Sequence, residues 1–366
     1  MSAGPDLHTR YEQDLRLFPN WWRRTGFLAM VAAWMLGPFV LSDFWTTVLA
    51  YAGVAAIGAV GLNLLTGFTG QVSLGHAFFL GIGAYVAAQL GGDTGLPLVV
   101  WLPLAAVAGA LIGAVVGPFA LRLRGQYLVI VTLGLVFLGE HIFKEWDSVT
   151  GGGGGTPVRP SLDVGPIDFS GMELLGRDFR REHMIFWLGW LLAGVAALLA
   201  VNLVRSRPGR AMQAVRDRDL AAEIIGVNLF RYKVGAFAIS SAFAAVAGSL
   251  HGILLTHVDP AQWSLLLSIQ YVAMIIIGGL GTIFGSVLGA IAVTAIPRII
   301  EESSKTQDLP LISGDRGGSS GVITVFSLNR MLFGLLIIVF LIFEPRGLAA
   351  VWLRLKAYFK TWPFSY

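Results

Sequence analysis

The sequence predicts an all-α, polytopic membrane protein with about ten transmembrane helices, some of them interrupted, and an inverted internal repeat. Two observations carry this prediction. The 366 residues are 55% hydrophobic and only 13% charged, whereas soluble globular domains carry about 25% charged residues. Apolar runs also recur along the whole chain, and roughly 20 apolar residues are enough for a helix to cross a bilayer.

Ten apolar segments define the expected helices. They follow a polar segment, residues 1–26, in which we expect no signal peptide because a short apolar core with a cleavage site is not seen. Trp21 and Trp22 precede the first helix, as interfacial anchors do. The eighth and ninth segments are short and nearly continuous, so nine helices is the alternative count. The segments are residues 27–42, 45–65, 72–90, 98–121, 126–143, 184–204, 232–256, 265–280, 282–300 and 329–343.

The distribution of positive charge predicts the orientation of these segments. With the N-terminus inside, the cytoplasmic regions are residues 1–26, 66–71, 122–125, 205–231, the turn near 280 and the tail 346–366. Most of the Lys and Arg residues fall in these regions, and cytoplasmic loops are enriched in such cations. We therefore expect both termini in the cytoplasm and a transmembrane domain over residues 27–345.

Two long loops are then external. Residues 144–182 contain the run Gly151–Gly155 and are expected to form a loop with a short surface helix, and residues 301–328 are polar and rich in Gly and Ser. External loops of this size either receive a soluble partner or serve only as connections.

The most charged stretch is the cytoplasmic loop 204–233, which has seven cations. Pro208 suits the first turn of a helix, and Gly226 suits a position just past a helix end. The residues Ala211, Val215, Ala222 and Ile225 fall on one predicted apolar stripe. Such a helix either lies on lipid headgroups or docks into a groove of a cytoplasmic partner protein.

Polar residues and glycines interrupt two apolar regions. Gly61–Tyr85 contains six glycines together with Asn63, Thr66, Thr69, Gln71, Ser73 and His76. These groups indicate either close packing of helices through small residues or an interrupted helix that lines a substrate path. A second glycine-rich break occurs in Met274–Ala290. Breaks in both halves suggest an inverted repeat that relates segments two to five to segments seven to ten.

The sequence offers no catalytic or metal-binding pattern. There is no Cys and no H-E-x-x-H spacing, and the phosphate-binding G-x-x-x-x-G-K-[ST] pattern is absent. His76 and His251 are isolated and are expected to be packed residues. A stand-alone secondary transporter would need a buried carboxylate for its coupling ion, and only Glu140 is a candidate.

Several blocks, in order along nearly the whole chain, resemble the LivM-type permease of branched-chain amino acid ABC importers. The set is specific although each block alone is not. The blocks are NLLTGFTGQVSLGHAFFLGIGAY (Asn63–Tyr85), LRLRGQYLVIVTLG (Leu121–Gly134), WDSVTGG (Trp146–Gly152), SRPGRAMQAVRDRDLAAEIIGVNLFRYKVGAFAIS (Ser206–Ser240), GGLGTIFGSVLGA (Gly278–Ala290) and FEPRGL (Phe343–Leu348).

The resemblance implies a multi-pass permease of the bacterial cytoplasmic (inner) membrane, in contact with membrane lipid. Its implied partners are a LivH-type permease, two cytoplasmic ABC ATPases and an extracytoplasmic substrate-binding protein. ATP and Mg would bind to the partner ATPases, and this chain would be no enzyme, with no catalytic residue, cofactor, metal or nucleic acid. The implied solute is a branched-chain amino acid, and relatives that carry urea, short amides or aromatic acids leave those solutes as alternatives.

The resemblance also assigns roles to residues. Residues 204–233 look like the coupling loop, and Ala221-Ala222-Glu223 followed by Gly226 resembles the EAA-type motif that docks into an ATPase. The expected coupling residues are Arg210, Arg216, Asp217, Ala221, Ala222, Glu223 and Gly226, and Arg216, Asp217 and Glu223 would make charged contacts at the rim of the ATPase groove. The expected translocation path contains Asn63, Thr66, Gly67, Gln71, Ser73, His76, Gly278 and Gly281. Gly151–Gly155 and the length of the 301–328 loop depart from the family pattern.

Overall fold

A computed structural model describes residues 21–121, 126–163, 180–306 and 347–361, together with the short pieces 173–174, 177–178, 312–313 and 323–324 and single helical positions between 331 and 342. The chain divides into two compact units, Met1–Thr46 and Thr47–Tyr366. In the first unit, α2 (Trp21–Val40) is an apolar helix with Pro38 near its end.

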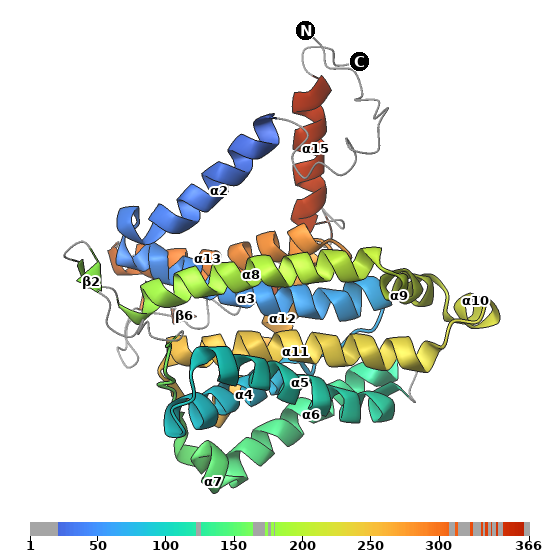
Figure 1. Ribbon diagram of the computed structural model, residues 1–366, viewed down its shortest axis with the longest axis horizontal. Helices are drawn as coiled ribbons and strands as arrows, with labels where there is room; N and C mark the ends of the chain where they lie inside the picture. The colour runs from blue at the N-terminus through green and yellow to red at the C-terminus, as the bar shows by residue number, and fades with distance from the viewer. Residues whose placement is uncertain are drawn as a thin grey trace. The chain divides into compact units, whose positions relative to one another are not determined.

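The second unit is built from helices, and its described strands are only two residues long (Figure 1). The long elements are α3 (Asp43–Thr69, which begins in the first unit), α4 (His76–Val86) with its π-helical extension η1 (Ala87–Asp93), α5 (Leu98–Leu121), α6 (Gln126–Glu145), α8 (Arg181–Arg205), α9 (Arg207–Asp217), α11 (Leu229–Leu255), α12 (Leu265–Gly278), α13 (Ile283–Thr306) and α15 (Gly347–Thr361). The short elements are α7 (Asp147–Thr150), η2 (Gly152–Gly154), α10 (Asp219–Ile224), η3 (Pro260–Trp263), β1 (Thr156–Pro157), β2 (Glu173–Leu174), β3 (Arg177–Asp178), β4 (His257–Val258), β5 (Ile312–Ser313) and β6 (Ile323–Thr324).

The all-α prediction is confirmed. Among the described residues, six helices are long and apolar enough to cross a membrane: α3, α5, α6, α8, α11 and α13. Shorter apolar stretches lie at Leu28–Val40 and Leu265–Gly278. Only single positions of the last expected segment, 329–343, belong to the described part of the chain.

From residue 47 onward, α3 is the central helix of the second unit and is buried along most of its length. Its sequence is apolar on every side, as expected for a helix that is surrounded by others. Val60, Leu64 and Phe68 of α3 form a buried cluster with Ala200 of α8. Partly buried side chains of α11 and α13, such as Phe243 and Val287, complete the cluster. The polar residues at the end of α3 are therefore held against α8, α11 and α13.

The helix α11 packs closely against α4 and α5, which lie beside it in Figure 1. On α5, Gly109 and Gly113 are four residues apart, and a Cβ atom at either position would overlap Ser241 of α11. On α4, Gly83 lies against the backbone of Ala245, and the Ser249 hydroxyl donates a 2.8 Å hydrogen bond to the Gly83 carbonyl. Small residues thus allow the backbones to approach, as they do between membrane helices.

The described part of the 144–182 loop folds back onto helix ends. It contains α7, and β1 pairs antiparallel with β4 immediately after α11. Gly151 and Gly155 have positive φ angles of 72° and 71°, which glycine adopts without steric cost. The Trp101 indole N–H donates to the Ser161 carbonyl at 3.0 Å. Part of the glycine run therefore serves the turn that pins this loop to α5 and α11.

Candidate functional site

The charged loop after α8 forms two short helices, α9 and α10, at one end of α8 and α11 (Figure 1). Ser206 caps α9 by accepting a hydrogen bond from the Gly209 N–H, and Pro208 lies in its first turn as predicted. Arg218 separates the helices with an extended backbone (φ −159°, ψ 106°). Gly226 follows the end of α10 with a φ of +90°, which also agrees with its predicted position.

The break at Arg218 changes which apolar residues are buried. Val215 of α9 and Ala222 of α10, two residues of the predicted apolar stripe, are buried. Ile225 of the same stripe is 76% exposed, so the four residues do not form one continuous face. A helical period of 3.6 residues does not continue through an extended residue, and α10 therefore turns other side chains outward. Leu220 and Ile224 are 67% and 85% exposed beside Ile225.

The other expected coupling residues lie mostly on the exposed side of this segment. Asp217, Ala221, Glu223 and Gly226 are exposed. Arg210 is exposed too, and its guanidinium donates to the Arg205 carbonyl at 2.9 Å.

Arg216 differs from these residues because its guanidinium reaches toward the end of α3. Its Nη1 donates a 2.9 Å hydrogen bond to the Gly67 carbonyl, while Nε and Nη2 donate to Asp217 Oδ1 at 3.1 and 3.0 Å. A Cβ atom at Gly281 would lie 3.2 Å from Arg216 Nη1. Arg216 therefore contacts both glycine-rich breaks, and only part of its side chain faces outward.

Asn63 joins the two breaks directly. Its amide nitrogen donates to the Thr282 carbonyl at 2.9 Å and to the Ser286 hydroxyl at 2.6 Å. Its amide oxygen accepts a 2.9 Å hydrogen bond from the Gly281 N–H. The side chain is 0% exposed. This set of three hydrogen bonds, which we call the Asn63 cross-link, holds α3 to the start of α13.

Close backbone approach at the Asn63 cross-link requires glycine. A Cβ atom at Gly67 would overlap Asn63 Oδ1 and the Gly281 nitrogen. Gly281 has a φ of +74°, a conformation that residues with side chains rarely adopt. At Gly278, a Cβ atom would overlap the Gly285 carbonyl of α13. The predicted path residues Asn63, Gly67, Gly278 and Gly281 are thus brought together.

The segment after α3 is tied to α11 and, through it, to α10. The Thr66 hydroxyl donates to the Gln71 carbonyl at 3.1 Å, and Gln71 Nε2 donates to the Lys233 carbonyl at 3.4 Å. The Lys233 ammonium pairs with Asp219 of α10 at 2.9 Å. The loop 204–233 is therefore connected to the end of α3 by a second set of contacts, in addition to the hydrogen bond of Arg216.

Ser73 and His76 are buried at the start of α4. The Ser73 hydroxyl accepts a hydrogen bond from the Gly75 N–H at 3.2 Å. The ring of His76 packs against Tyr271 of α12 with centroids 4.9 Å apart. Both residues lie away from the Asn63 cross-link and contact different neighbours.

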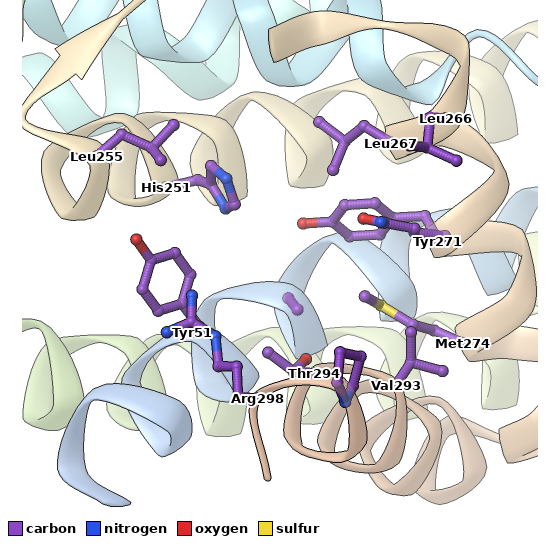
Figure 2. Close-up of a pocket in the computed structure, with 13 residues that line it drawn as sticks. Tyr51, His251, Leu255, Leu266, Leu267, Tyr271, Met274, Val293, Thr294 and Arg298 are labelled. Atoms are coloured by element: carbon purple, nitrogen blue, oxygen red, sulfur yellow. The ribbon is translucent and has the colours of Figure 1, made fainter. Parts of the chain in front are cut away.

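The structure also contains a cavity of about 320 Å³ that the sequence did not reveal (Figure 2). Its walls come from α3, α11, α12 and α13, and they include Tyr51, His251, Tyr271 and Arg298. Aromatic residues and arginine are ordinary features of membrane helices and their interfaces, and of these four residues only His251 was singled out from the sequence, as a packed residue. Among the described residues, no group of three His, Cys, Asp or Glu side chains is arranged to hold a metal ion.

Comparison with known proteins places these features in a family. The family model described as branched-chain amino acid transport system, permease component, matches residues 44–341. The high-affinity branched-chain amino acid transport system permease protein LivM of Escherichia coli is 30% identical over 297 residues, which cover 78% of this chain and 69% of LivM. LivM of Salmonella typhimurium is 31% identical over the same length.

The other permease type of that system is also similar. LivH of Escherichia coli is 26% identical over 251 residues, which cover 64% of this chain and 78% of LivH. No solved structure matches. The matched region contains both glycine-rich breaks and the α9–α10 segment. The chain therefore belongs to the family of permease components of branched-chain amino acid transport systems.

Proposed function

We propose that this chain is one of two permease subunits of an ABC importer for branched-chain amino acids. The likeness to LivM and, over a shorter length, to LivH supports pairing with a LivH-type permease. Two cytoplasmic ATPases would bind ATP and Mg and supply the energy, and an extracytoplasmic binding protein would deliver the solute. The chain itself performs no covalent chemistry in this proposal.

The observation that carries the proposal is a continuous set of contacts from an exposed apolar surface to both helix breaks. Leu220, Ile224 and Ile225 form this surface on α10. Apolar side chains on a short exposed helix suit a groove on a partner protein. Behind them, Arg216 holds Gly67, and the Asn63 cross-link holds Gly281 and Ser286.

These contacts suggest how ATPase movement reaches the membrane domain. An ATPase seated on α10 would displace α9 and α10 together, and Arg216 would pass that displacement to the end of α3. The Asn63 cross-link would then move the start of α13 with α3. The pair Asp219–Lys233 would carry α11 along. We propose that these helices tilt when the permease changes from its outward-open to its inward-open conformation.

We further infer ten membrane passages in the bacterial inner membrane, with both termini in the cytoplasm. Helices α3 to α6 correspond to the expected segments two to five, and helices α11 to α13 correspond to segments seven to nine. An inverted repeat would relate the first of these series to the second. Each series contains one glycine-rich interruption, which supports an inverted repeat and ten membrane passages. In this arrangement α9 and α10 face the cytoplasmic ATPases.

The first experiment is uptake of radiolabelled leucine by cells with the intact gene cluster and by cells in which only this gene is deleted. Urea and benzoate serve as comparison solutes for the alternatives within the family. We expect loss of leucine uptake alone, with recovery when the gene is supplied in trans. Loss of urea or benzoate uptake with normal leucine uptake would leave an importer of another solute.

Co-purification tests the partners. A tagged wild-type chain should bring down both ATPases and the second permease from detergent-solubilised membranes. Ile224→Asp should lose the ATPases but keep the second permease, because it places a charge in the apolar docking surface. Arg159→Gln, at an exposed position of the 144–182 loop, is the matched control and should keep every partner. ATPase recovery with Ile224→Asp equal to wild type would contradict docking through α10.

A further inference from the structure

The cavity seen in Figure 2 lies at the opposite ends of the helices that carry the Asn63 cross-link. On α3, Tyr51 precedes Asn63 by twelve residues, about 18 Å at 1.5 Å per residue. On α13, Arg298 follows Ser286 by the same number of residues. The cavity is therefore separate from the coupling contacts, yet α3 and α13 carry both.

One wall of the cavity is cationic. The Arg298 guanidinium lies over the Tyr51 ring, 3.8 Å from its centroid. None of the thirteen residues that line the cavity is acidic, and Arg298 belongs to neither salt bridge found among the described residues. A guanidinium in such surroundings is poised to bind a carboxylate, which it contacts through two parallel N–H groups.

The opposite wall offers a hydroxyl that lacks a partner. Tyr271 is 1% exposed, and its Oη has no hydrogen-bond partner within the part of the chain that the structure describes. Figure 2 shows this hydroxyl directed into the cavity, across from Tyr51 and Arg298. Because an unpaired buried hydroxyl is costly, this group indicates a bound polar ligand.

The same region of α13 provides a hydrogen-bond acceptor. Pro297 lies inside α13 and has no N–H, so the Val293 carbonyl lacks its usual helical donor. Both residues line the cavity. A free carbonyl at this position suits an ammonium group next to the carboxylate that Arg298 would hold.

Most of the remaining lining is apolar, beside His251, Gln270 and Thr294, and the volume is small. Leucine side chains dominate this part, and Met274 adds a flexible thioether. About 320 Å³ lies at the lower end of the roughly 300–1,000 Å³ of small-molecule sites. The apolar part is contributed by Leu255, Leu266, Leu267, Met274, Val293 and Pro297.

We propose that this cavity binds the solute on its way through the permease, as an α-amino acid with an aliphatic side chain. Arg298 would hold the carboxylate, the Val293 carbonyl and the Tyr271 hydroxyl would receive the ammonium group, and the leucine residues would contact the side chain. This inference rests on the proposed importer function and assigns residues of this chain to the contacts with the solute. Urea and short amides carry no negative charge and would leave Arg298 unpaired.

The test is leucine uptake in the gene-deleted strain with the complete set of partner proteins, complemented by variants of this chain. The binding protein is identical in every strain, so a difference between variants arises in the permease. We expect Arg298→Gln to reduce the maximal uptake rate at least about tenfold, since a charged hydrogen bond is lost. Arg298→Lys should transport at a rate between those of Arg298→Gln and wild type, because it retains the cation but loses the two parallel N–H groups.

Arg159→Gln is the matched control, an exposed arginine outside the cavity, and should transport at the wild-type rate. Co-purification of the ATPases verifies that each variant assembles. Wild-type rates with Arg298→Gln, or equal losses with Arg298→Gln and Arg298→Lys, would overturn the carboxylate site. If the wild-type chain itself restores no leucine uptake, the proposed function fails, which is a separate result.

Tyr271→Phe gives a second measurement that does not depend on the stability of Arg298 variants. It removes one hydroxyl and keeps the ring that packs on His76. We expect uptake to fall about threefold to tenfold, as for loss of one hydrogen bond, while assembly is retained or improved. A purely structural Tyr271 would give unchanged uptake in this variant, and that result would remove the hydroxyl from the proposed site.

Discussion

At the scale of single residues, Asn63 shows how a polar group is kept inside an apolar helix. Both functional atoms of its amide are used, and its partners come from the turn before α13 and from α13 itself. A polar group in hydrocarbon without such partners would cost several kcal/mol. In this conformation the side chain therefore joins two helices.

Asn63→Ala should weaken both packing and transport. It leaves the Gly281 N–H without a partner, and an unpaired buried group costs about 1–3 kcal/mol. We expect a lower thermal unfolding midpoint of the purified complex, together with reduced leucine uptake. Asn202→Ala, at an exposed position on α8, should leave both unchanged. An unaltered midpoint for Asn63→Ala with lost uptake would instead favour direct contact with the solute.

Gly67→Ala tests the close approach of the two breaks. The added methyl group would overlap Asn63 Oδ1 and the Gly281 nitrogen, so we expect loss of most leucine uptake and a destabilisation of about 1–3 kcal/mol. Gly194→Ala is the matched control on α8, where nothing lies within 4 Å of the new Cβ. The control should be neutral or slightly stabilising, since Ala favours helices by up to about 1 kcal/mol. Equal behaviour of the two variants in thermal unfolding and uptake would contradict a steric requirement at Gly67.

The sequence identified Asn63 and Gly67 because polar residues and glycines stand out in an apolar run. The residues that they contact could not be predicted. Ser286, for example, lies 223 residues after Asn63, and hydropathy does not indicate which distant residues are in contact. Tyr271 and Arg298 were missed for a different reason. Tyr271 lies in the middle of an apolar segment and Arg298 near the end of one, where both look ordinary, and only the fold shows that they face one cavity.

At the scale of elements, hydropathy predicted the helix positions well and their interruptions less well. The expected segment 98–121 coincides with α5, and 265–280 closely matches α12. The division of the loop 204–233 into α9 and α10 was not predicted, because no glycine or proline marks the extended residue Arg218 that separates them. The exposure of Ile225 is a direct consequence of that division.

Arg216→Ala addresses the link between α9 and α3. Without the guanidinium, the Gly67 carbonyl loses its contact with α9, while α9 keeps its Ser206 cap and its buried Val215. We expect continued ATP hydrolysis by the assembled complex with leucine uptake reduced about tenfold or more. The two rates are measured on the same proteoliposomes.

Arg231→Ala, an exposed cation at the start of α11, provides the comparison for Arg216→Ala. It removes the same charge from the same loop but no contact with α3, and it should transport normally. If both variants transport at the wild-type rate, Arg216 has no part in coupling. If both variants lose the ATPases, binding of the ATPases requires the positive charge of the loop and does not depend specifically on the contact with Gly67.

At the scale of the whole second unit, α3 and α13 carry the proposed coupling contacts at one end and the cavity at the other. Asn63 and Ser286 lie on the coupling side, and Tyr51 and Arg298 line the cavity. Helices are stiff, and a displacement at one end becomes a tilt at the other. This arrangement requires that the α9–α10 segment and the cavity lie toward opposite membrane faces.

The absence of cysteine from the chain allows this orientation to be tested with single substitutions. Asn228→Cys lies between α10 and α11, and Arg159→Cys lies in the loop pinned to the other end of α11; both positions are exposed. Because Lys and Arg are enriched in cytoplasmic loops, a membrane-impermeant maleimide should label Arg159→Cys in spheroplasts and Asn228→Cys only after the membrane is opened. The cysteine-free wild-type chain is the control for background labelling. Labelling of Asn228→Cys in intact spheroplasts would reverse the orientation and place α10 out of reach of a cytoplasmic ATPase.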